Sequence, residues 1–261
     1  MSSEANKPPD EDDLWEALEV TPADVLEGMS VRSPCPNCNR SRMYFCYTCF
    51  IPVASLHVFS VAPEGRLPNV RLPVDVDIIK HPKEVEGKST AVHAAVLAPA
   101  QVKIYTHPIF PDYPSDGSVL LVFPSPEARS IEAEMALRNS QASSRPLKKL
   151  VFIDSTWNQT PRIVKDPRLK SLPRVKLEGV RTLFWRYQHG KPRTHLATIE
   201  AIYHALRVVR STKEDAGGDN GLGNLLFFFK FMYDKVVSLY GKDNIKAFQD
   251  VDDVDLRFAV R

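Results

Sequence analysis

From about residue 72, the sequence alternates short apolar runs with stretches of helical periodicity, and this alternation limits the fold more than any other feature. Strands that alternate with helices favour an α/β domain with a mainly parallel sheet. The expected strands cover residues 74–79, 102–105, 119–123, 150–153 and, more weakly, 182–185. The expected helices cover residues 91–97, 126–137, 196–210 and 224–240.

The totals set the size of the core. A chain of 261 residues that is 43% hydrophobic can bury one sizeable core, or a core with a small satellite. No run approaches the roughly 20 apolar residues that a membrane helix needs. The first ten residues also contain no apolar core of a signal peptide. We therefore expect a soluble, intracellular protein with no membrane partner.

The two ends of the chain are acidic. Residues 1–30 hold nine acidic residues against one basic residue, so this segment is expected to be largely disordered. Short helical turns are expected within 13–30, with Thr21 as N-cap and Pro22 at the first helical position. A loosely ordered acidic tail is expected over 241–261. The predicted units are thus 1–30, a cysteine module at 31–55, a catalytic domain at 56–240, and the tail.

All four cysteines fall within fifteen residues, as two Cys-x-x-Cys pairs joined by a seven-residue spacer. Two such pairs can close a tetrahedral thiolate site for zinc, and four protein ligands leave no open position for chemistry. Disulfides are the alternative, which an intracellular chain disfavours. The sequence therefore predicts a structural zinc site, with ligands Cys35, Cys38, Cys46 and Cys49.

A basic stretch covers residues 161–193, where ten basic residues face two acidic ones. This local excess of +8, derived from ten minus two, favours a polyanionic partner. A solvated surface is the alternative explanation.

Polar clusters lie at four of the expected turns. They are His81-Pro82-Lys83-Glu84 with Lys88-Ser89-Thr90, then Phe123-Pro124-Ser125, Asp154-Ser155-Thr156-Trp157, and Thr198-Ile199-Glu200-Ala201. In open α/β sheets, ligands bind at the carboxyl ends of the strands. Each cluster also has a structural explanation. His81 can be a hydrogen-bonded structural residue, and the turn after Phe123 can be a helix start with Pro126 at its first position. Asp154 or Ser155 can cap a helix while Trp157 packs in the core, and Glu200 can make a favourable helix-dipole contact.

In their order and approximate spacing, these clusters resemble the DTW-domain family, whose signature is an Asp-x-Thr-Trp box. With the cysteine pairs in front, the resemblance covers about residues 31–240 and is closest to the tRNA-uridine aminocarboxypropyltransferases of eukaryotes. One departure is Ala197, where relatives commonly carry Ser, so a hydrogen bond from that position is lost.

The resemblance implies a fold and a reaction. The fold is a SPOUT-like α/β domain with a deep trefoil knot that holds S-adenosylmethionine. The reaction transfers the 3-amino-3-carboxypropyl group of this donor to N3 of a D-loop uridine in tRNA and releases methylthioadenosine. The resemblance also implies a nuclear location.

Two residues of the box are the catalytic candidates. Asp154 is either the general base for the uridine N3 proton or a stabiliser of the sulfonium cation, and both roles stay open. Trp157 offers a π-face to the sulfonium or the adenine. The predicted donor-binding residues are Phe123, Pro124, Ser125, Asp154, Ser155, Thr156, Trp157, Thr198 and Glu200.

Basic and aromatic residues are predicted to bind the RNA by neutralising phosphates and stacking on extruded bases. The predicted set is Arg145, Lys148, Lys149, Arg186, Tyr187, Lys191 and Arg193. Two other functions are compatible with the sequence: an RNA methyltransferase that uses the same donor, and a zinc-ribbon RNA-binding protein without catalysis.

Overall fold

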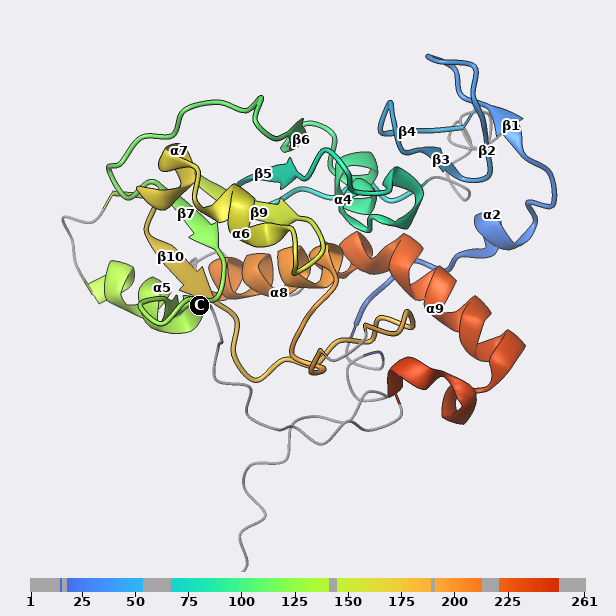
Figure 1. The fold of residues 1–261 in the computed structure, drawn as a ribbon. Coiled ribbons are helices and arrows are strands. Elements are labelled where there is room, and N and C mark those ends of the chain that lie inside the picture. Colours follow the sequence, from blue (N-terminus) through green and yellow to red (C-terminus); the bar gives the residue numbers. More distant parts are fainter. Residues whose placement is uncertain are drawn as a thin grey trace, which may run out of the picture.

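The computed structural model describes residues 15, 18–53, 67–140, 145–188, 191–212 and 221–248 (Figure 1). The expectations for residues 1–12 and for the acidic run 250–255 lie outside the described residues. The last described part of the tail forms two 3-10 turns, Lys242–Asn244 and Lys246–Phe248. None of the helices in these ranges is long and apolar enough to cross a membrane.

A six-stranded sheet is the centre of the fold, with strand order β6-β5-β9-β7-β10-β8. Each pair of neighbouring strands is parallel, so the predicted α/β class with a mainly parallel sheet is confirmed. The strands are β5 (Asp75–Lys80), β6 (Val102–Thr106), β7 (Val119–Val122), β8 (Arg129–Ser130), β9 (Lys149–Asp154) and β10 (Arg174–Lys176).

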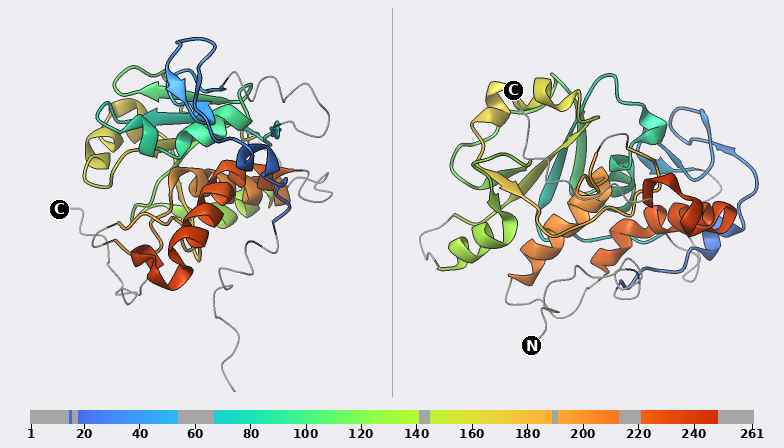
Figure 2. Two further views of the ribbon diagram at one scale, coloured as in Figure 1. Left: turned by 90° about the vertical axis from the view of Figure 1, so that its right-hand side faces the viewer. Right: turned by 60° about the horizontal axis from the view of Figure 1, so that its bottom comes forward.

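Helices cover both faces of this sheet (Figures 1 and 2). The longer ones are α4 (Ala91–Leu97), α5 (Ile131–Ser140), α8 (Thr198–Ser211) and α9 (Phe227–Tyr240). The shorter ones are α2 (Asp24–Glu27), α6 (Thr160–Val164), α7 (Pro167–Lys170) and the 3-10 helices Glu86–Lys88 and Leu222–Leu226.

The strands separate two hydrophobic cores because successive side chains point to opposite faces of a sheet. In β9, Leu150 and Phe152 join the large core with α4, α8 and α9. Val151 joins the smaller core with Ile163 of α6 and Leu169 of α7. The run 150–153 is apolar throughout because β9 is a central strand that is buried on both faces.

The cysteine segment forms two small antiparallel hairpins, one of β1 (Ser33–Pro34) with β2 (Ser41–Arg42) and one of β3 (Phe45–Cys46) with β4 (Ile51–Pro52). Phe45 packs on Phe228 of α9, with ring centroids 4.7 Å apart. Tyr44 meets Phe231 of the same helix edge-on at 5.3 Å. The module is therefore attached to the large core through α9.

Several predicted boundaries were wrong. Residues 182–185 form no strand, because the Thr182 N–H donates to the carbonyl of Arg193 and the Leu183 N–H to the Glu200 carboxylate, not to a neighbouring strand. The two strands that were not predicted from the sequence are β8 and β10. Helix α5 starts at Ile131 instead of residue 126, because 129–130 pair with β10 as β8. Helix α2 is capped at Ala23, while the Thr21 N–H donates to the side chain of Asn224.

Candidate active site

A pocket of about 500 Å³ opens at the carboxyl ends of β9 and β7. This volume lies within the range of small-molecule sites. Asp154, Ser155, Thr156 and Trp157 line it, together with Phe123, Pro124 and Thr198. Its remaining walls are the loop 84–90 that precedes α4 and the segment 184–198 that leads into α8.

Asp154 ends β9 and holds the starts of two helices. Its Oδ2 accepts a hydrogen bond from Ser89 Oγ at 2.7 Å, and its Oδ1 accepts one from Thr198 Oγ1 at 2.8 Å. Its side chain is buried, and burial raises the pKa of the carboxyl, although the two hydroxyls and Lys80 act in the opposite direction. Asp154 therefore fixes α4 and α8 against the strand end.

Trp157 lies between two other rings of the pocket. His195 lies 4.0 Å away between ring centroids, and Phe123 lies 6.5 Å away, each tilted by 34°. Burial, followed by the charge of Lys191, lowers the pKa of His195 to about 4, so the imidazole is neutral near pH 7. Sequence analysis missed His195, although its place just before the Leu196-Ala197-Thr198 string was a usable signal.

Two segments close over the pocket from opposite sides. Arg186 donates from its Nη1 to the carbonyl of Lys88 at 2.7 Å, which joins the segment 184–198 to the loop 84–90. The loop itself is joined to the strand end, because the His81 N–H donates to the Asp154 carbonyl at 2.9 Å. Glu84 lines the pocket from this loop. Ser89 and Glu84 belong to the motif, but their direct part in the site was not predicted.

Two predicted donor-binding residues do not line the pocket. Ser125 directly follows Pro124, and its buried hydroxyl has no hydrogen-bond partner among the described residues. The carboxylate of Glu200 lies behind the site, where it accepts from Thr182 Oγ1 at 2.6 Å and from the N–H groups of Leu183 and Ala197 at 2.6 and 2.7 Å. Glu200 thus holds the segment 182–183 on the start of α8.

The predicted RNA-binding residues separate into two groups. Arg186, Tyr187 and Lys191 line the pocket, and Arg193 lies just behind it, donating to the Thr182 carbonyl at 3.0 Å. Arg145, Lys148 and Lys149 lie at the opposite end of β9. Because a strand rises about 3.3 Å per residue, Lys149 and Asp154 lie far apart, at the two edges of the sheet.

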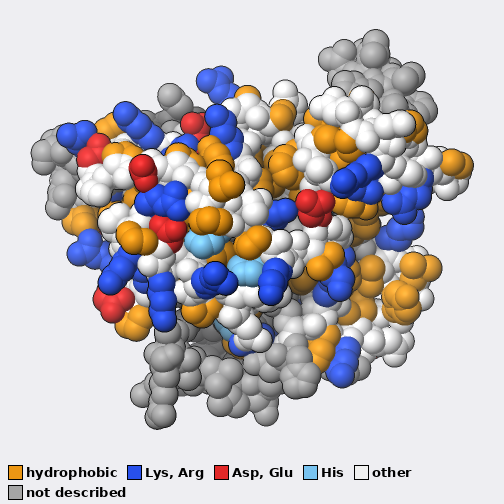
Figure 3. All heavy atoms as spheres, turned by 45° about the horizontal axis from the view of Figure 1, so that its top comes forward, with side chains coloured by type: hydrophobic (Ala, Val, Ile, Leu, Met, Phe, Trp, Pro, Cys, Tyr) orange, Lys and Arg blue, Asp and Glu red, His pale blue; other side chains and the backbone are white. Residues whose placement is uncertain are grey.

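Figure 3 shows Lys and Arg side chains across one face of the molecule, with acidic side chains among them. Several bases of the stretch 161–193 are already paired with acids. Arg168 binds the carboxylate of Asp166 at 2.9 Å, and Lys176 binds Glu178 at 2.7 Å. These two acids are the ones already subtracted in the excess of +8, so the pairing leaves that excess unchanged.

The four cysteine thiols form a cluster in which all sulfur atoms lie within 4.8 Å of one another, and none is in a disulfide. A tetrahedral site with Zn–S bonds of about 2.3 Å places its sulfurs about 3.8 Å apart. The measured distance from Cys38 Sγ to Cys46 Sγ is 3.6 Å. Asn39 and Phe50 directly follow the two Cys-x-x-Cys pairs, and both have a left-handed backbone, with φ of 56° and 57°. The cluster fits a metal ion of this size.

Together, the fold and the site define an α/β protein with an enzyme-like small-molecule pocket at the carboxyl edge of a parallel sheet, beside a metal-compatible cysteine cluster. Residues 43–237 match the model of the DTW domain family. The chain therefore belongs to the DTW-domain family.

Three relatives carry the name tRNA-uridine aminocarboxypropyltransferase 1. The protein from Xenopus laevis is 42% identical over 85% of this chain and 87% of its own length. The proteins from Mus musculus and Homo sapiens are 43% and 42% identical, each over 78% of this chain and 77% of their own length. The solved structure of the SAM-dependent rRNA:acp-transferase Tsr3 from Vulcanisaeta distributa covers 66% of this chain and 85% of that one, with 18% identity and a TM-score of 0.38. That score is too low to establish a shared fold.

Proposed function

We propose that this chain is a tRNA-uridine aminocarboxypropyltransferase that uses S-adenosylmethionine as donor and modifies N3 of a D-loop uridine. The observation that carries the proposal is the convergence of the Asp154 box, Phe123 and Thr198 on one pocket. The relatives that bear this activity in their names match most of the chain, and the match includes this pocket.

The pocket suits the donor. Trp157 and Phe123 provide aromatic surface for the adenine or the sulfonium, and cations are attracted to such rings. Asp154 supplies negative charge near the sulfonium in a site where water is displaced and electrostatic interactions are strong. The buried hydroxyl of Ser125, at the border of the pocket, has an unused hydrogen-bonding capacity that the amino-acid end of the donor would satisfy.

Positioning decides which group is transferred. A sulfonium carries three carbon substituents, and only the γ-methylene gives the aminocarboxypropyl product. Groups that hold the amino-acid end of the donor turn this carbon towards the uridine, and near-attack geometry of this kind contributes several kcal/mol. Thr156 and Thr198 line the pocket with Asp154 and are suited to this task.

The rim of the pocket is the part of the surface that we assign to the reacting nucleotide. Arg186 and Lys191 offer positive charge, and Tyr187, which is 41% exposed, offers a ring for stacking. A D-loop base has to leave its stack to reach a donor in this pocket. A more remote contact by Arg145, Lys148 and Lys149 remains part of the proposal, as does binding of the tRNA backbone by Arg193.

A structural zinc ion in the cysteine cluster is also part of the proposal. The four thiolates would fill its coordination sphere, so the ion would order the two hairpins and take no part in transfer. Two contacts connect the cysteine module to the loop beside the pocket. Thr48 Oγ1 donates to Glu86 at 3.1 Å, and Glu86 pairs with Lys80 at the end of β5. The SPOUT-like knot and a nuclear location complete the proposal. An experimental structure and imaging of the tagged protein test them.

The decisive experiment is mass spectrometry of the nucleosides from unmodified tRNA that has been incubated with the protein and S-adenosylmethionine. We expect aminocarboxypropyluridine and one equivalent of methylthioadenosine. A methylated uridine would identify the alternative RNA methyltransferase, and tRNA binding without any product would identify a non-catalytic binding protein.

Asp154→Asn tests the site within the same experiment. We expect a rate reduced by about 100-fold or more, because the variant removes a buried negative charge from the pocket, with tRNA affinity retained. Asp75→Asn is the matched control, since Asp75 is exposed and begins β5 at the opposite edge of the sheet. Equal rates for the two variants would remove Asp154 from the catalytic site.

A further inference from the structure

The pocket contains two carboxylates, and only one of them was considered for catalysis from the sequence. Asp154 uses each of its oxygens to accept a hydroxyl from the protein, Ser89 on one side and Thr198 on the other. Its side chain is almost fully buried. A general base needs an oxygen within hydrogen-bond reach of the proton that it removes. Asp154 is therefore arranged as a support for the two helix starts, and its almost complete burial keeps it from an incoming uridine.

Glu84 is the second carboxylate. It is half-buried and lines the same pocket as Asp154 and Thr156. The Glu84 N–H donates to the His81 carbonyl at 2.9 Å, and the His81 N–H donates to the Asp154 carbonyl. This short turn fixes Glu84 at the end of β9. An ionised carboxylate has about four acceptor positions. Among the described residues, no side chain donates a hydrogen bond to the Glu84 carboxylate, which leaves room for a substrate N–H.

Charges around Glu84 suit proton transfer. Burial raises the pKa of Glu84 above its usual value, and the nearby Asp154 raises it further, while nearby backbone N–H groups and Lys80 lower it. Arg186, which crosses from the segment 184–198, also interacts with this carboxylate. A base whose pKa is shifted towards the working pH is more effective than an ordinary carboxylate.

We propose that Glu84 accepts the N3 proton of the uridine, while Asp154 positions Ser89 and Thr198 and balances the positive donor. This inference rests on the proposed function. The N3–H bond breaks and its proton passes to the Glu84 carboxylate. The N3 electron pair forms the bond to the γ-carbon of the donor. The bond from that carbon to sulfur breaks, and its electrons neutralise the sulfonium to give the thioether methylthioadenosine.

The test is the pH dependence of kcat/KM for Glu84→Gln, Glu84→Asp and the wild type, with donor affinity measured by calorimetry. In the wild type, we expect activity to rise with pH along an acidic limb. Glu84→Gln should lose about 100-fold or more in rate and should lose this limb, with donor affinity changed by less than about twofold. Glu84→Asp should keep the limb at an intermediate rate, because it retains a carboxylate that is one methylene shorter.

Glu86→Gln is the matched control, since Glu86 lies on the same loop and its carboxylate pairs with Lys80 and Thr48. It should keep the acidic limb. An acidic limb that persists in Glu84→Gln would overturn the inference. A loss of kcat/KM that comes wholly from weaker donor binding would also overturn it, because Glu84 would then be a group that binds the donor's ammonium. If Glu84→Gln fails to bind the donor, loss of the limb in Glu84→Asp would equally overturn it. A wild type that makes no aminocarboxypropyluridine would instead contradict the proposed function.

Discussion

The strands of the parallel sheet all begin at one edge of the sheet, the amino edge, and end at the other, the carboxyl edge. Both edges carry charged residues, but the contacts of these residues differ. At the carboxyl edge, Asp154 and Glu84 face a pocket of about 500 Å³. At the amino edge, Lys149 binds the buried carboxylate of Asp77 at 3.0 Å, and Tyr113 donates to the same carboxylate. Lys149 and Asp77 at the amino edge are paired with each other, whereas Asp154 and Glu84 at the carboxyl edge surround a space for a ligand.

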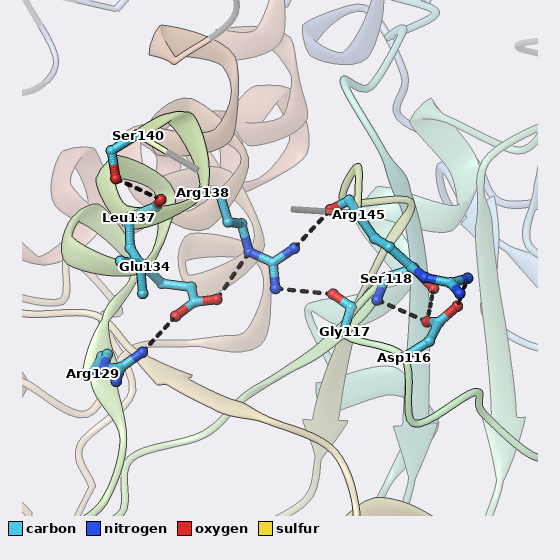
Figure 4. A network of polar contacts seen from close by, with 9 residues as sticks. All are labelled: Asp116, Gly117, Ser118, Arg129, Glu134, Leu137, Arg138, Ser140 and Arg145. Carbon is cyan, nitrogen blue, oxygen red and sulfur yellow. Dashed lines mark hydrogen bonds and ion pairs between the residues drawn. The ribbon is translucent and has the colours of Figure 1, made fainter. Parts of the chain in front are cut away.

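Figure 4 shows how the pairing at the amino edge extends to neighbouring loops. Arg145 binds Asp116 at 2.7 Å, and Arg138 bridges Glu134 and the carbonyl of Gly117, both at 2.9 Å. A base that already holds an acid must give up part of that interaction to bind a phosphate. The comparison therefore suggests that the amino edge stabilises the fold and that the carboxyl edge performs the chemistry.

The largest effect is expected from the metal site beside the carboxyl edge. Cys46→Ser removes one of the four thiolates. Metal binding at such a site contributes several kcal/mol to the free energy of folding. We expect lost metal, a clearly lower Tm, and a raised KM for the donor, because Thr48 contacts Glu86 on the pocket loop. Elemental analysis, thermal unfolding and calorimetry measure these effects. Ser41→Ala, an exposed change in the same module, should keep the metal. Full stability in a strong chelator, with no metal detected, would contradict the zinc proposal.

The second prediction concerns the free energy of unfolding, which should depend on the paired charges of the amino edge. Lys149→Met should lower the free energy of unfolding by about 2–4 kcal/mol, because it leaves the carboxylate of Asp77, which is 1% exposed, without its cation. At saturating tRNA, the transfer rate per folded molecule should not change. Urea unfolding and a transfer assay measure the two quantities. The neighbouring exposed residue provides the control: Lys148→Met removes the same charge and should cost less than about 0.5 kcal/mol. Equal losses for both variants would show that the amino edge is not a stabilising centre.

The two edges also differ in how well sequence predicts them. The end of β9 was predicted because an apolar run that ends in Asp154 identifies the ligand-binding edge of a parallel sheet. The same reasoning would have placed Lys149, at the start of that run, on the opposite edge. It was instead grouped with the RNA-binding residues by charge alone.

Other features of the fold and the site could not be predicted from the local sequence pattern. The strand β10 has three residues with Arg174 and Lys176 at its ends, so it gives no apolar run. The Ser89 contact to Asp154 joins residues 65 positions apart. Likewise, nothing local indicates that the carboxylate of Glu200 faces the backbone of 182–183 rather than the donor. Central strands can be read from hydrophobicity, whereas edge strands and the contacts between loops depend on the assembled fold.

Glu200 gives a pH-dependent effect at the carboxyl edge. Burial raises its pKa from 4.5 to about 7, although Thr182 and two backbone N–H groups act in the opposite direction. Between these two values the folded chain binds a proton that the unfolded chain has lost, so stability falls as pH rises, by up to about 1.4 kcal/mol per pH unit. Glu200→Gln should flatten this part of the curve in urea unfolding at pH 5, 6 and 7. Glu178→Gln, at an exposed site, should leave it unchanged. An unaltered slope in Glu200→Gln would show that Glu200 does not titrate in this range.

The smallest expected effect is on tRNA affinity, and it compares one basic residue from each edge of the sheet. Lys191 lines the pocket, whereas Arg145 is 67% exposed at the amino edge and paired with Asp116. Each phosphate contact that is removed reduces the salt dependence of binding by about one unit of slope. Lys191→Ala should therefore weaken tRNA binding and reduce the slope, while Arg145→Ala should change both less, and stability by at most about 1 kcal/mol. Binding isotherms at several salt concentrations measure this. A larger effect for Arg145→Ala would mean that the tRNA extends over the amino edge, whose paired charges would then serve binding as well as stability.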